Sequence, residues 1–580
     1  MTNSNSFEYK AYIDGLRALA VIPVVFFHAG FKWFEGGFVG VDVFFVISGF
    51  LITSIILRDK ENNEFSIIKF YLRRIRRIIP ALFLVTFFTI LLAITFMSAP
   101  DIKLFSKSVF SVIFFVSNFF FWRNSGYFGP ENELTPLLHT WSLGVEEQFY
   151  IFFPIFLVLF WKFRKNYLIL AITIISVLSF LLAQIGGNFK YMNLSVNYPF
   201  LKLPFQWFWQ AGSADFYLPF GRIWELMIGT LTAFYLQKNK VKETFENNYY
   251  SYLGFLLIIF SIIFFSENIQ YPSVFTIAPA VGTALIIIFT TQRTHLNKML
   301  SNKFLVNLGL ISFSFYLWHL PLFAFARIYF VSELSFVLSN IIVVLSLVLS
   351  YFSWKYVEKP FRNRKIISDK KLLTYFVVSF SIIFVLASLI HFNKIYKRVE
   401  LPKKISHSMK KLVPQEHCFD INFAHLKDSK KWYCEIGSIN KPISFAVIGD
   451  SHALTFKPVL SVIAEEKNLK GIFAGFSGCI PLLDIYTIRG DQVETNCKKL
   501  NEKLFNFIKA NKITKIFLVS RWNYYTDGTY DKSNFSLISK DKVFASNPQK
   551  SREAFKYGLN NTVERYNKIK VKVIFIHQVP

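Results

Sequence analysis

The stretch Tyr12-Ile-Asp-Gly-Leu-Arg17-Ala-Leu-Ala-Val-Ile-Pro-Val-Val-Phe-Phe-His28-Ala-Gly30 decides the fold of this chain. It is apolar and long enough to cross a lipid bilayer, yet it contains an arginine and a histidine. Burying arginine in hydrocarbon costs roughly 2.5–3.5 kcal/mol on insertion scales, so such residues usually face the interior of a helix bundle. Arg17, His28 and Asp14 lie on one face of a helix, with Arg17 and His28 roughly 16 Å apart along its axis. The pattern predicts a transmembrane helix with a polar stripe, which is either a satisfied structural pair or part of a reaction path.

Composition and the other apolar runs predict a membrane protein. Of the 580 residues, 53% are hydrophobic and 19% are aromatic, and a soluble chain would not contain so many runs of spanning length. We predict a polytopic α-helical membrane domain of about 11 transmembrane helices, over 12–30, 38–57, 78–97, 149–161, 167–184, 219–236, 251–266, 274–290, 308–330, 335–353 and 373–391. The formal net charge of +28 is interpreted as a determinant of membrane topology. We therefore expect a lipid bilayer and no nucleic acid as a partner.

Basic residues indicate which loops lie in the cytoplasm. The loop 58–77 contains seven lysines and arginines, and the positive-inside rule places it inside. The N-terminus is then cytoplasmic and the C-terminal domain is periplasmic or otherwise extracytoplasmic. A full crossing by the apolar run 104–122 would invert every later loop, so we expect that run to be re-entrant or interfacial.

The composition changes after residue 392. Residues 393–442 are rich in lysine and are interpreted as a stem, whereas 443–580 alternates short apolar runs with helical ones. The runs 443–448, 513–519 and 571–576 read as buried strands. Strands separated by helical stretches predict an α/β domain with a parallel sheet.

A serine follows directly on the first of these strands, in Gly449-Asp-Ser451-His452. A serine on a tight turn between strand and helix exposes its hydroxyl near the amides of the helix N-terminus, which can stabilise an oxyanion. The alternative is that Asp450 and Ser451 are an ordinary N-cap. Gly478 and Asn523 also follow strand-like runs, so we expect them beside the same sheet edge as further members of an oxyanion hole.

All four cysteines lie in the extramembrane part. An outside location is oxidising, so the pairs Cys418–Cys434 and Cys479–Cys497 are the simplest possible disulfides, with four reduced core cysteines as the alternative. The chain has no CxxC motif and no Cys/His cluster, so we expect no metal site.

An ordered set of motifs resembles a known family. The membrane motifs are Asp14-Gly-Leu-Arg17-Ala-Leu-Ala with His28, Gly37-Phe-Val-Gly-Val-Asp42-Val-Phe-Phe-Val-Ile-Ser-Gly49, Arg73-Arg-Ile-Arg-Arg77-Ile-Ile-Pro80, Leu138-His139-Thr-Trp141-Ser-Leu-Gly-Val-Glu146-Glu147-Gln-Phe-Tyr150, Arg222-Ile-Trp224-Glu225-Leu, Ser314-Phe-Tyr316-Leu-Trp318-His319 and Val357-Glu358-Lys-Pro360. With these motifs the membrane half is similar to the acyltransferase 3 family of bacterial membrane proteins. The strand, Gly-Asp-Ser block, later glycine and later asparagine described above resemble the SGNH hydrolase fold.

The resemblance covers nearly the whole chain and implies a division into parts. These are an acyltransferase 3 membrane domain (1–371), an additional transmembrane helix (372–392), the stem (393–442) and an SGNH-like domain (443–580). It also implies a bacterial inner-membrane enzyme that O-acetylates a cell-surface glycan, such as lipopolysaccharide O-antigen or peptidoglycan. The donor would be cytoplasmic acetyl-CoA, with no permanently bound cofactor.

Several residues suit that chemistry. Acetyl-CoA is polyanionic, so its site needs positive charge at the inner face. Arg73, Arg76 and Arg77 share one helical face with Arg74 adjacent, although topology alone also explains these arginines. Arg17, with Asp14, can hold the phosphates or pantetheine, and Trp141 is assigned to the same donor site.

Histidine and carboxylate side chains supply the candidate proton transfers. His28 is deeper in its helix than Arg17 and can act as general base or transient acyl carrier, unless it is only a core histidine. Glu146 and Glu147 begin the fourth span, where they can orient His28 or activate an acceptor hydroxyl, or else interact with the helix dipole. His139 and His319 are interpreted as packing residues.

The chain departs from the SGNH pattern at its end. An SGNH enzyme needs a histidine, normally with an aspartate three residues earlier, to activate its serine. No Asp-x-x-His follows Ser451, and His577 lacks the aspartate. We therefore expect the SGNH-like domain to be C-terminally incomplete and Ser451 to be a weak nucleophile.

We predict a membrane O-acyltransferase in which the acyl group passes by way of His28 to Ser451 and then to a glycan hydroxyl. Two alternatives remain: a membrane-anchored glycan O-acyl esterase, and a transporter of lipid-linked sugars without chemistry.

Overall fold

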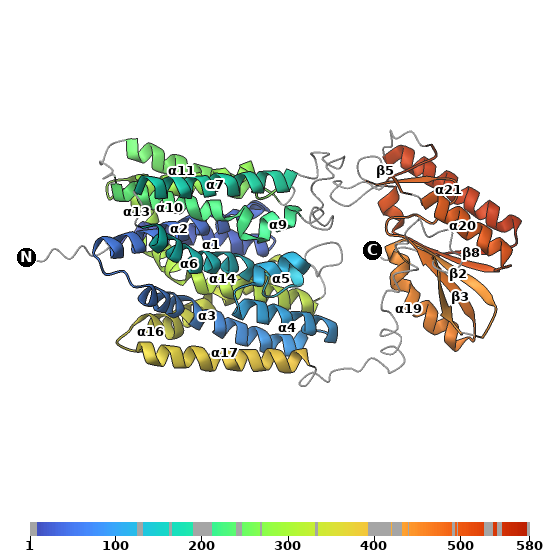
Figure 1. Cartoon of the computed structure of the whole chain (residues 1–580), viewed down its shortest axis with the longest axis horizontal. Helices are drawn as coiled ribbons and strands as arrows, with labels where there is room; N and C mark the ends of the chain where they lie inside the picture. The colour runs from blue at the N-terminus through green and yellow to red at the C-terminus, as the bar shows by residue number, and fades with distance from the viewer. Residues whose placement is uncertain are drawn as a thin grey trace, which may run out of the picture. The chain divides into compact units, whose positions relative to one another are not determined.

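The chain folds into two compact units, Met1–Lys397 and Arg398–Pro580. The first is a helix bundle and the second is an α/β unit (Figure 1). The computed structural model describes residues 9–124, 132–161, 165–188, 211–238, 246–266, 269–330, 334–392, 419, 432–438, 440–489, 493–495, 497–526, 537–541 and 548–576.

A helix lies in each of the eleven predicted spans, so the predicted polytopic helical fold is confirmed. These helices are α1 (Ala11–His28), α2 (Gly40–Glu61), α3 (Ile67–Phe96), α6 (Thr140–Phe160), α7 (Lys165–Asn188), α10 (Ile223–Lys238), α11 (Glu246–Phe264), α12 (Ile277–Phe289), α14 (Lys303–Phe330), α15 (Phe336–Ser353) and α17 (Asp369–His391). Among the described residues, nine helical segments are long and apolar enough to cross a membrane. Helices α10 and α12 are shorter than these.

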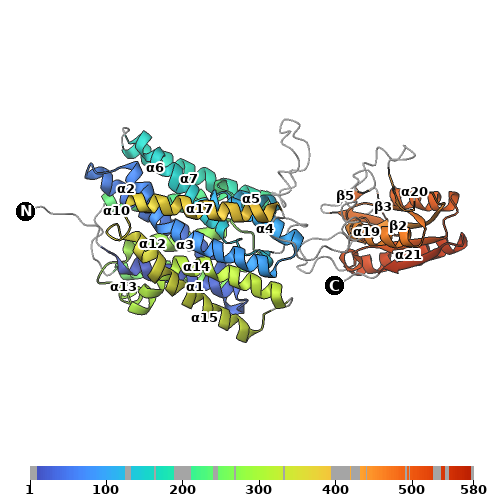
Figure 2. The ribbon, with the colours of Figure 1, turned by 90° about the horizontal axis from the view of Figure 1, so that it is seen from below.

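The apolar run 104–122 is divided between two helices. These are α4 (Ala99–Ile113) and α5 (Ser117–Asn124), and Phe115 between them has a positive φ of 56°. Helix α4 packs against α17 and α5 packs against α6; Figure 2 shows α17 running alongside α3 and α4. Neither short helix reaches the length that a membrane crossing requires, and the re-entrant placement of this segment stays a prediction.

Helix α6 begins nine residues before the predicted span 149–161, at Thr140. The prediction placed Glu146 and Glu147 at the start of this helix, whereas the helix includes six residues before Glu146, and the bundle interior accommodates these polar side chains. The Gln148 side chain donates to the Phe115 carbonyl and to Asn118, and Glu147 is buried. Glu146 therefore lies almost two turns inside the helix and not at its start.

A wide helical turn connects α15 to the short helix that follows it. Residues Trp354–Glu358 form a π-helical segment, which leads into α16 (Lys359–Arg362). Single π turns are uncommon and occur frequently at functional sites. This turn buries Glu358, which accepts hydrogen bonds from Ser314 on α14 and from Arg362.

Helices α1 and α14 cross with their backbones in contact. A Cβ atom on Gly309 of α14 would lie 1.8 Å from the Asp14 carbonyl oxygen of α1. Next to this crossing, a Cβ atom on Gly15 would lie 1.9 Å from the carbonyl oxygen of Leu300, the last residue of α13 (His295–Leu300). Small residues allow such approaches between membrane helices. The crossing fixes the end of α1 that carries Asp14 and Arg17.

The second unit is built on a five-stranded sheet in the order β1-β3-β2-β6-β8. Its strands are β1 (Cys434–Gly437), β2 (Ile443–Gly449), β3 (Lys470–Gly475), β6 (Lys515–Val519) and β8 (Lys572–Ile576). Strands β3, β2, β6 and β8 are parallel, as predicted for an α/β domain, and only β1 among the strands of this sheet runs antiparallel. A smaller sheet has the order β5-β4-β7, with strands β4 (Tyr486–Arg489), β5 (Val493–Thr495) and β7 (Ile538–Ser539).

Helices cover both faces of the large sheet. Alternate residues of β2 point to opposite faces: Phe445 and Val447 pack with α19 (Ser451–Glu466), while Ala446 and Ile448 pack with α20 (Cys497–Ala510) and α21 (Pro548–Lys568). This alternation explains why the strand reads as a continuous apolar run in the sequence.

The register of the sheet brings several loops to one edge. Gly449 pairs with Gly475 and with Val519, and Val519 pairs with Ile576. The segments after β2, β3 and β6 therefore leave the sheet at the same carboxyl edge, which is where α/β folds usually bind ligands.

Replacing Gly309 by alanine is expected to destabilise the first unit by about 1–3 kcal/mol, because the added methyl group forces α1 and α14 apart. The apparent unfolding temperature of the purified full chain in detergent measures this. The control is Asn307→Ala, on the exposed side of the same helix. Equal unfolding temperatures for the two variants would show that the crossing does not hold the bundle together.

Candidate functional site

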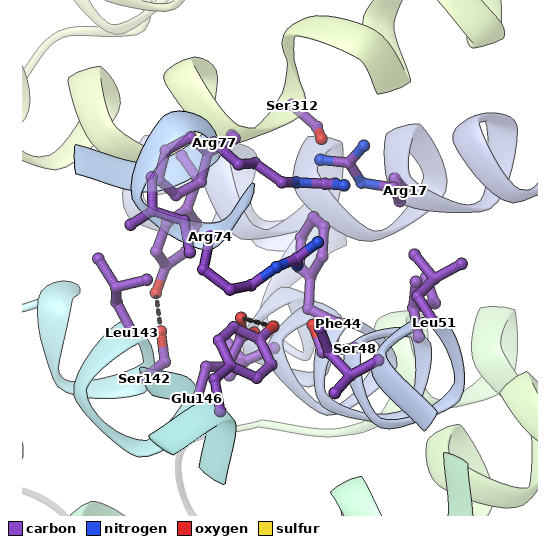
Figure 3. Close-up of a pocket in the computed structure, with 17 residues that line it drawn as sticks. Arg17, Phe44, Ser48, Leu51, Arg74, Arg77, Ser142, Leu143, Glu146 and Ser312 are labelled. Carbon is purple, nitrogen blue, oxygen red and sulfur yellow. Dashed lines mark hydrogen bonds between the residues drawn. The ribbon is translucent and has the colours of Figure 1, made fainter. Parts of the chain in front are cut away.

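Three arginines converge on a pocket in the helix bundle. Arg17 of α1 and Arg74 and Arg77 of α3 line a cavity of about 90 Å³, together with Glu146 of α6 and Ser312 of α14. Figure 3 shows the three guanidinium groups pointing toward one another. Like charges brought together inside an apolar bundle repel each other, so the arrangement favours binding of an anion. We call this cavity the arginine pocket.

The charges of the pocket are only partly balanced by the protein. Arg17 forms an ion pair with Asp14, at 3.2 Å between Nη1 and Oδ1. Arg74 lies over the rings of Phe70 and Tyr150, each 5.8 Å away. Within the described part of the chain, neither Arg74 nor Arg77 forms an ion pair. These two side chains are therefore available to a negatively charged ligand.

The structure places Arg73 and Arg76 outside the pocket. Arg73 forms an ion pair with Asp59 at 2.8 Å. Arg76 forms one with Asp369 at 2.6 Å and also donates to two backbone carbonyls. The predicted face of Arg73, Arg76 and Arg77 is thus replaced by the pair Arg74 and Arg77, because acids from other helices hold the remaining two arginines.

Glu146 lies in the arginine pocket, and the expectation that it would orient His28 is corrected. Helix α6 begins at Thr140, so the Glu146 carboxylate is carried down to the arginines, where it accepts a hydrogen bond of 2.8 Å from Tyr150. Glu147 is buried beside the pocket without lining it, and its Oε1 atom has no hydrogen-bond partner among the described residues.

His28 lines a second and larger cavity of about 340 Å³, which we call the histidine pocket. Its wall includes His139, Arg327 and many aromatic side chains: Phe27, Phe38, Trp141, Phe216, Tyr217, Tyr271 and Tyr316. Arg327 donates to the His28 carbonyl oxygen at 2.7 Å and pairs with Glu133, so the end of α1 is held in place. Trp141, which was predicted to belong to the donor site, lines this cavity and not the arginine pocket.

The two cavities lie along the same face of α1. Arg17 lines one and His28 lines the other, and both cavities are lined by Val41 and Tyr316. The polar stripe predicted from helical periodicity therefore faces the interior of the bundle along its length.

His28 is one member of a cluster of three histidines that sequence reasoning did not assemble. The ring of His319 lies 5.2 Å from that of His28 and 5.5 Å from that of His139, between centroids. The Nδ1 atom of His319 lies 2.6 Å from the Tyr316 carbonyl oxygen, so Nδ1 carries the proton and Nε2 is a buried acceptor without a partner among the described residues. His139 and His319, which we interpreted as packing residues, thus adjoin the candidate base.

A buried ion network supports the wall of the histidine pocket. Arg222, just before α10, forms ion pairs with Asp42 at 2.8 Å and with Glu225 at 2.9 Å, and Tyr271 donates to Asp42. Asp42 and Glu225 were named from the sequence only as members of motifs, with no partner assigned to either. The signal that could have found one is the spacing of Arg222 and Glu225, three residues apart on one helical turn.

In the second unit, Asp450 is the centre of the Gly-Asp-Ser turn. Its Oδ1 atom accepts from the His452 backbone amide at 2.9 Å, as an N-cap does. Its Oδ2 atom accepts from the Ser520 hydroxyl at 2.7 Å, the Arg521 amide at 3.0 Å and the Tyr525 hydroxyl at 2.9 Å. Burial, together with the Asp450 carboxylate, raises the pKa of Tyr525 well above its usual value, so Tyr525 stays a neutral donor.

The remaining predicted residues of this unit follow the same sheet edge. Ser451 begins α19 and is half-buried, so its hydroxyl lies at a helix N-terminus. Gly478 has a positive φ of 68° in the turn after β3. Asn523 is exposed in the short helix Trp522–Tyr525 after β6. His577 lies outside the described residues.

The cysteines are oxidised where the structure describes them. Cys479 and Cys497 form a disulfide that ties the turn containing Gly478 to α20. Cys434 is also disulfide-bonded, and Cys418 lies outside the described residues. Among the residues that are described, no group of three or more metal-ligating side chains is arranged to hold an ion.

Replacing Asp450 by asparagine is expected to destabilise the second unit by about 2–4 kcal/mol, because an amide has one acceptor oxygen and its NH2 group would face at least one of the four donors that the carboxylate satisfies. Hydrogen exchange of a β6 peptide in the full chain, followed as urea is raised, measures this. The neighbouring change Ser451→Ala is the control and is expected to alter stability by less than about 0.5 kcal/mol. Equal protection in both variants would contradict a central role for Asp450.

Comparison with known proteins agrees with the division into two units. An acyltransferase domain model matches residues 10–355, and a model of the SGNH domain that is fused to such domains matches residues 418–580. The chain is 30% identical over 379 residues to the peptidoglycan O-acetyltransferase OatA of Listeria monocytogenes, which covers 63% of this chain and 58% of the relative. It is 29% identical over 371 residues to the O-acetyltransferase OatA of Staphylococcus aureus, covering 62% and 58%.

These matches therefore span less than two thirds of the length of each relative. No solved structure matches the chain. The acyltransferase model alone covers more than half of the residues, in the part that contains both cavities, and the SGNH model covers the sheet with the Gly-Asp-Ser turn. The chain belongs to the acyltransferase 3 family and carries a fused SGNH domain.

Proposed function

We propose that this protein is a membrane O-acetyltransferase that takes an acetyl group from cytoplasmic acetyl-CoA and delivers it to a hydroxyl of a cell-surface glycan. The observation that supports this most directly is the arginine pocket, where three arginines meet one glutamate, Glu146, and where Arg74 and Arg77 form no ion pair with the described residues. Two free guanidinium groups suit the phosphates of the donor, because guanidinium binds phosphate in a bidentate manner.

Only part of the acetyl-CoA molecule enters the arginine pocket. The cavity of about 90 Å³ is far smaller than acetyl-CoA, so the arginines hold the phosphates at its mouth and the pantetheine end points inward. Along α1, the thioester then travels toward His28. Along α1 the arginine pocket comes first and the histidine pocket follows. This order suits a donor that has phosphates at one end and a reactive thioester at the other.

His28 is the group that we assign to acyl transfer. Its neutral ring nitrogen attacks the thioester carbonyl, and CoA leaves as its thiol after taking up the N–H proton of the ring. A hydroxyl then attacks the neutral acyl-imidazole, and its proton moves to the imidazole as the imidazole leaves. If His28 acts only as a base, it takes that proton while the hydroxyl attacks the thioester directly. Both routes need His28 in the cavity and uncharged at the start.

The orientation of the chain follows from its basic loops. We place the N-terminus and the arginine-rich start of α3 in the cytoplasm of a bacterial inner membrane, and the SGNH domain outside. The acetyl group then leaves the histidine pocket on the outer side. Ser451 at the carboxyl edge of the SGNH sheet is the relay that receives it and passes it to the glycan, with Gly478 and Asn523 beside it.

The acceptor is a glycan of the cell envelope. The name of the Listeria relative identifies peptidoglycan as its substrate, so peptidoglycan is the first acceptor to test here, ahead of the lipopolysaccharide O-antigen. An esterase would release acetate without consuming acetyl-CoA, and a transporter would leave the glycan unmodified; the two experiments below separate these activities from acetyl transfer.

Replacing Arg74 or Arg77 by alanine is expected to raise the KM for acetyl-CoA by about tenfold or more, because each change removes a charge-assisted hydrogen bond to phosphate. Initial rates of CoA release by the full chain in lipid nanodiscs measure this. The control is Arg73→Ala on the same helix, which is expected to leave KM nearly unchanged because Arg73 pairs with Asp59. A similar rise in KM for Arg73→Ala would show that the pocket does not select the donor.

Replacing His28 by alanine is expected to abolish acetylation of the surface glycan while the protein still inserts in the membrane. Mass spectrometry of peptidoglycan fragments from cells that lack the gene and carry either variant measures this. His295→Ala, at an exposed histidine at the start of a short helix, is the matched control and should retain acetylation. Normal acetylation in the His28 variant would refute the assigned role.

A further inference from the structure

Tyr316 stands between the two cavities. It lines the arginine pocket and the histidine pocket, as does Val41 on α2. Ser142 of α6 lines the arginine pocket next to it. An acyl group that moves from the arginines to His28 must therefore pass the Tyr316 side chain.

Hydrogen bonds hold that side chain in place. The Tyr316 hydroxyl donates to the His139 carbonyl oxygen at 2.8 Å and lies 2.7 Å from the Ser142 hydroxyl. The Ser142 hydroxyl is also 3.2 Å from the same carbonyl. The three oxygen atoms thus form a triangle, which ties α14 to the start of α6. Its two hydroxyl groups have one proton each, so two hydrogen bonds hold it at any time. Figure 3 shows the bond to Ser142 as a dashed line.

The rings around Tyr316 limit its movement further. Its ring meets that of His139 edge-on at 5.3 Å and lies 5.5 Å from that of His319. Phe44 approaches from α2 at 6.4 Å. Because the ring is clamped by packing and by the triangle, it is a fixed wall and not a freely moving side chain.

We propose that Tyr316, clamped by Ser142 and the His139 carbonyl, determines the size of the acyl group that the protein transfers. The constriction passes an acetyl group and excludes longer acyl chains, because each extra methylene must displace the clamped ring. This inference rests on the proposed function, since it concerns the donor that passes from one cavity to the other.

The size of the effect follows from the energetics of apolar pockets. One additional methylene is discriminated by about tenfold or more where the wall cannot yield. Removing the hydroxyl of Tyr316 opens the triangle but keeps the ring, so the loss of discrimination is partial. Removing the whole side chain joins the two cavities and abolishes the discrimination.

The experiment uses membrane vesicles from the host cell, which retain the natural glycan acceptor. They contain the full chain and receive labelled acetyl-CoA, propionyl-CoA or butyryl-CoA on the cytoplasmic side. The readout is the ratio of butyryl to acetyl esters on the glycan, released by mild base. We expect Tyr316→Ala to raise this ratio by about tenfold or more, and Tyr316→Phe and Ser142→Ala to raise it by less.

The matched control is Tyr12→Phe. Tyr12 is also a buried tyrosine whose hydroxyl donates to a backbone carbonyl, that of Ile287 at 3.2 Å, but it lines neither cavity. Its ratio should equal that of the wild type. If Tyr316→Ala does not fold, Tyr316→Phe and Ser142→Ala decide the question.

The outcomes separate the two proposals. Transfer of acetyl groups by the wild type, with an unchanged ratio in every folded Tyr316 and Ser142 variant, overturns the constriction and leaves the proposed function standing. An equal rise of the ratio in Tyr12→Phe also overturns it, because the effect would then be general loosening of the bundle. Absence of transfer from any acyl-CoA in the wild type overturns the proposed function, and the constriction with it.

Discussion

Positive charge held inside an apolar bundle is the constraint on which the first unit depends. Arg17, Arg74 and Arg77 share one cavity, and Asp14 pairs with only the first of them. Charges interact strongly where the surroundings are poorly polarisable, so the helices that carry them must be held firmly. The contact of α1 with α14 at Gly309 and the bonds of Arg76 supply that rigidity. The cavity is therefore prepared for an anion before any ligand arrives.

Periodicity predicted the part of the site that lies on one helix. Arg17 and His28 were placed on one face of α1, and the structure has both facing cavities in the bundle interior. The same reasoning could not choose between the faces of α3. Asp59 and Asp369 take up Arg73 and Arg76, and the positions of these acids depend on how distant helices pack. A single helix contains no information on that choice.

The second unit shows the same division between local and tertiary information. A strand followed by Gly-Asp-Ser predicts a turn at a sheet edge, and the register of β2 with β6 has that geometry. The bonds of Asp450 to Ser520 and Tyr525 join residues that are 70 and 75 positions apart. The histidine cluster and the Tyr316 triangle likewise join separate helices, which is why sequence reasoning treated His139 and His319 as packing residues.

In the π-helical turn at Trp354–Glu358, the number of residues determines the structure as much as the identity of the side chains does. Such a turn contains one residue more than the α-helical turn it replaces, so the helix beyond it is rotated by about 100°. Glu358 is the last residue of this turn, and it accepts a hydrogen bond from Ser314 of α14. Deletion of any single residue from this turn, whatever its side chain, would rotate the Glu358 carboxylate away from Ser314. The number of residues in this turn is therefore as much a part of the structure as the buried Glu358 carboxylate.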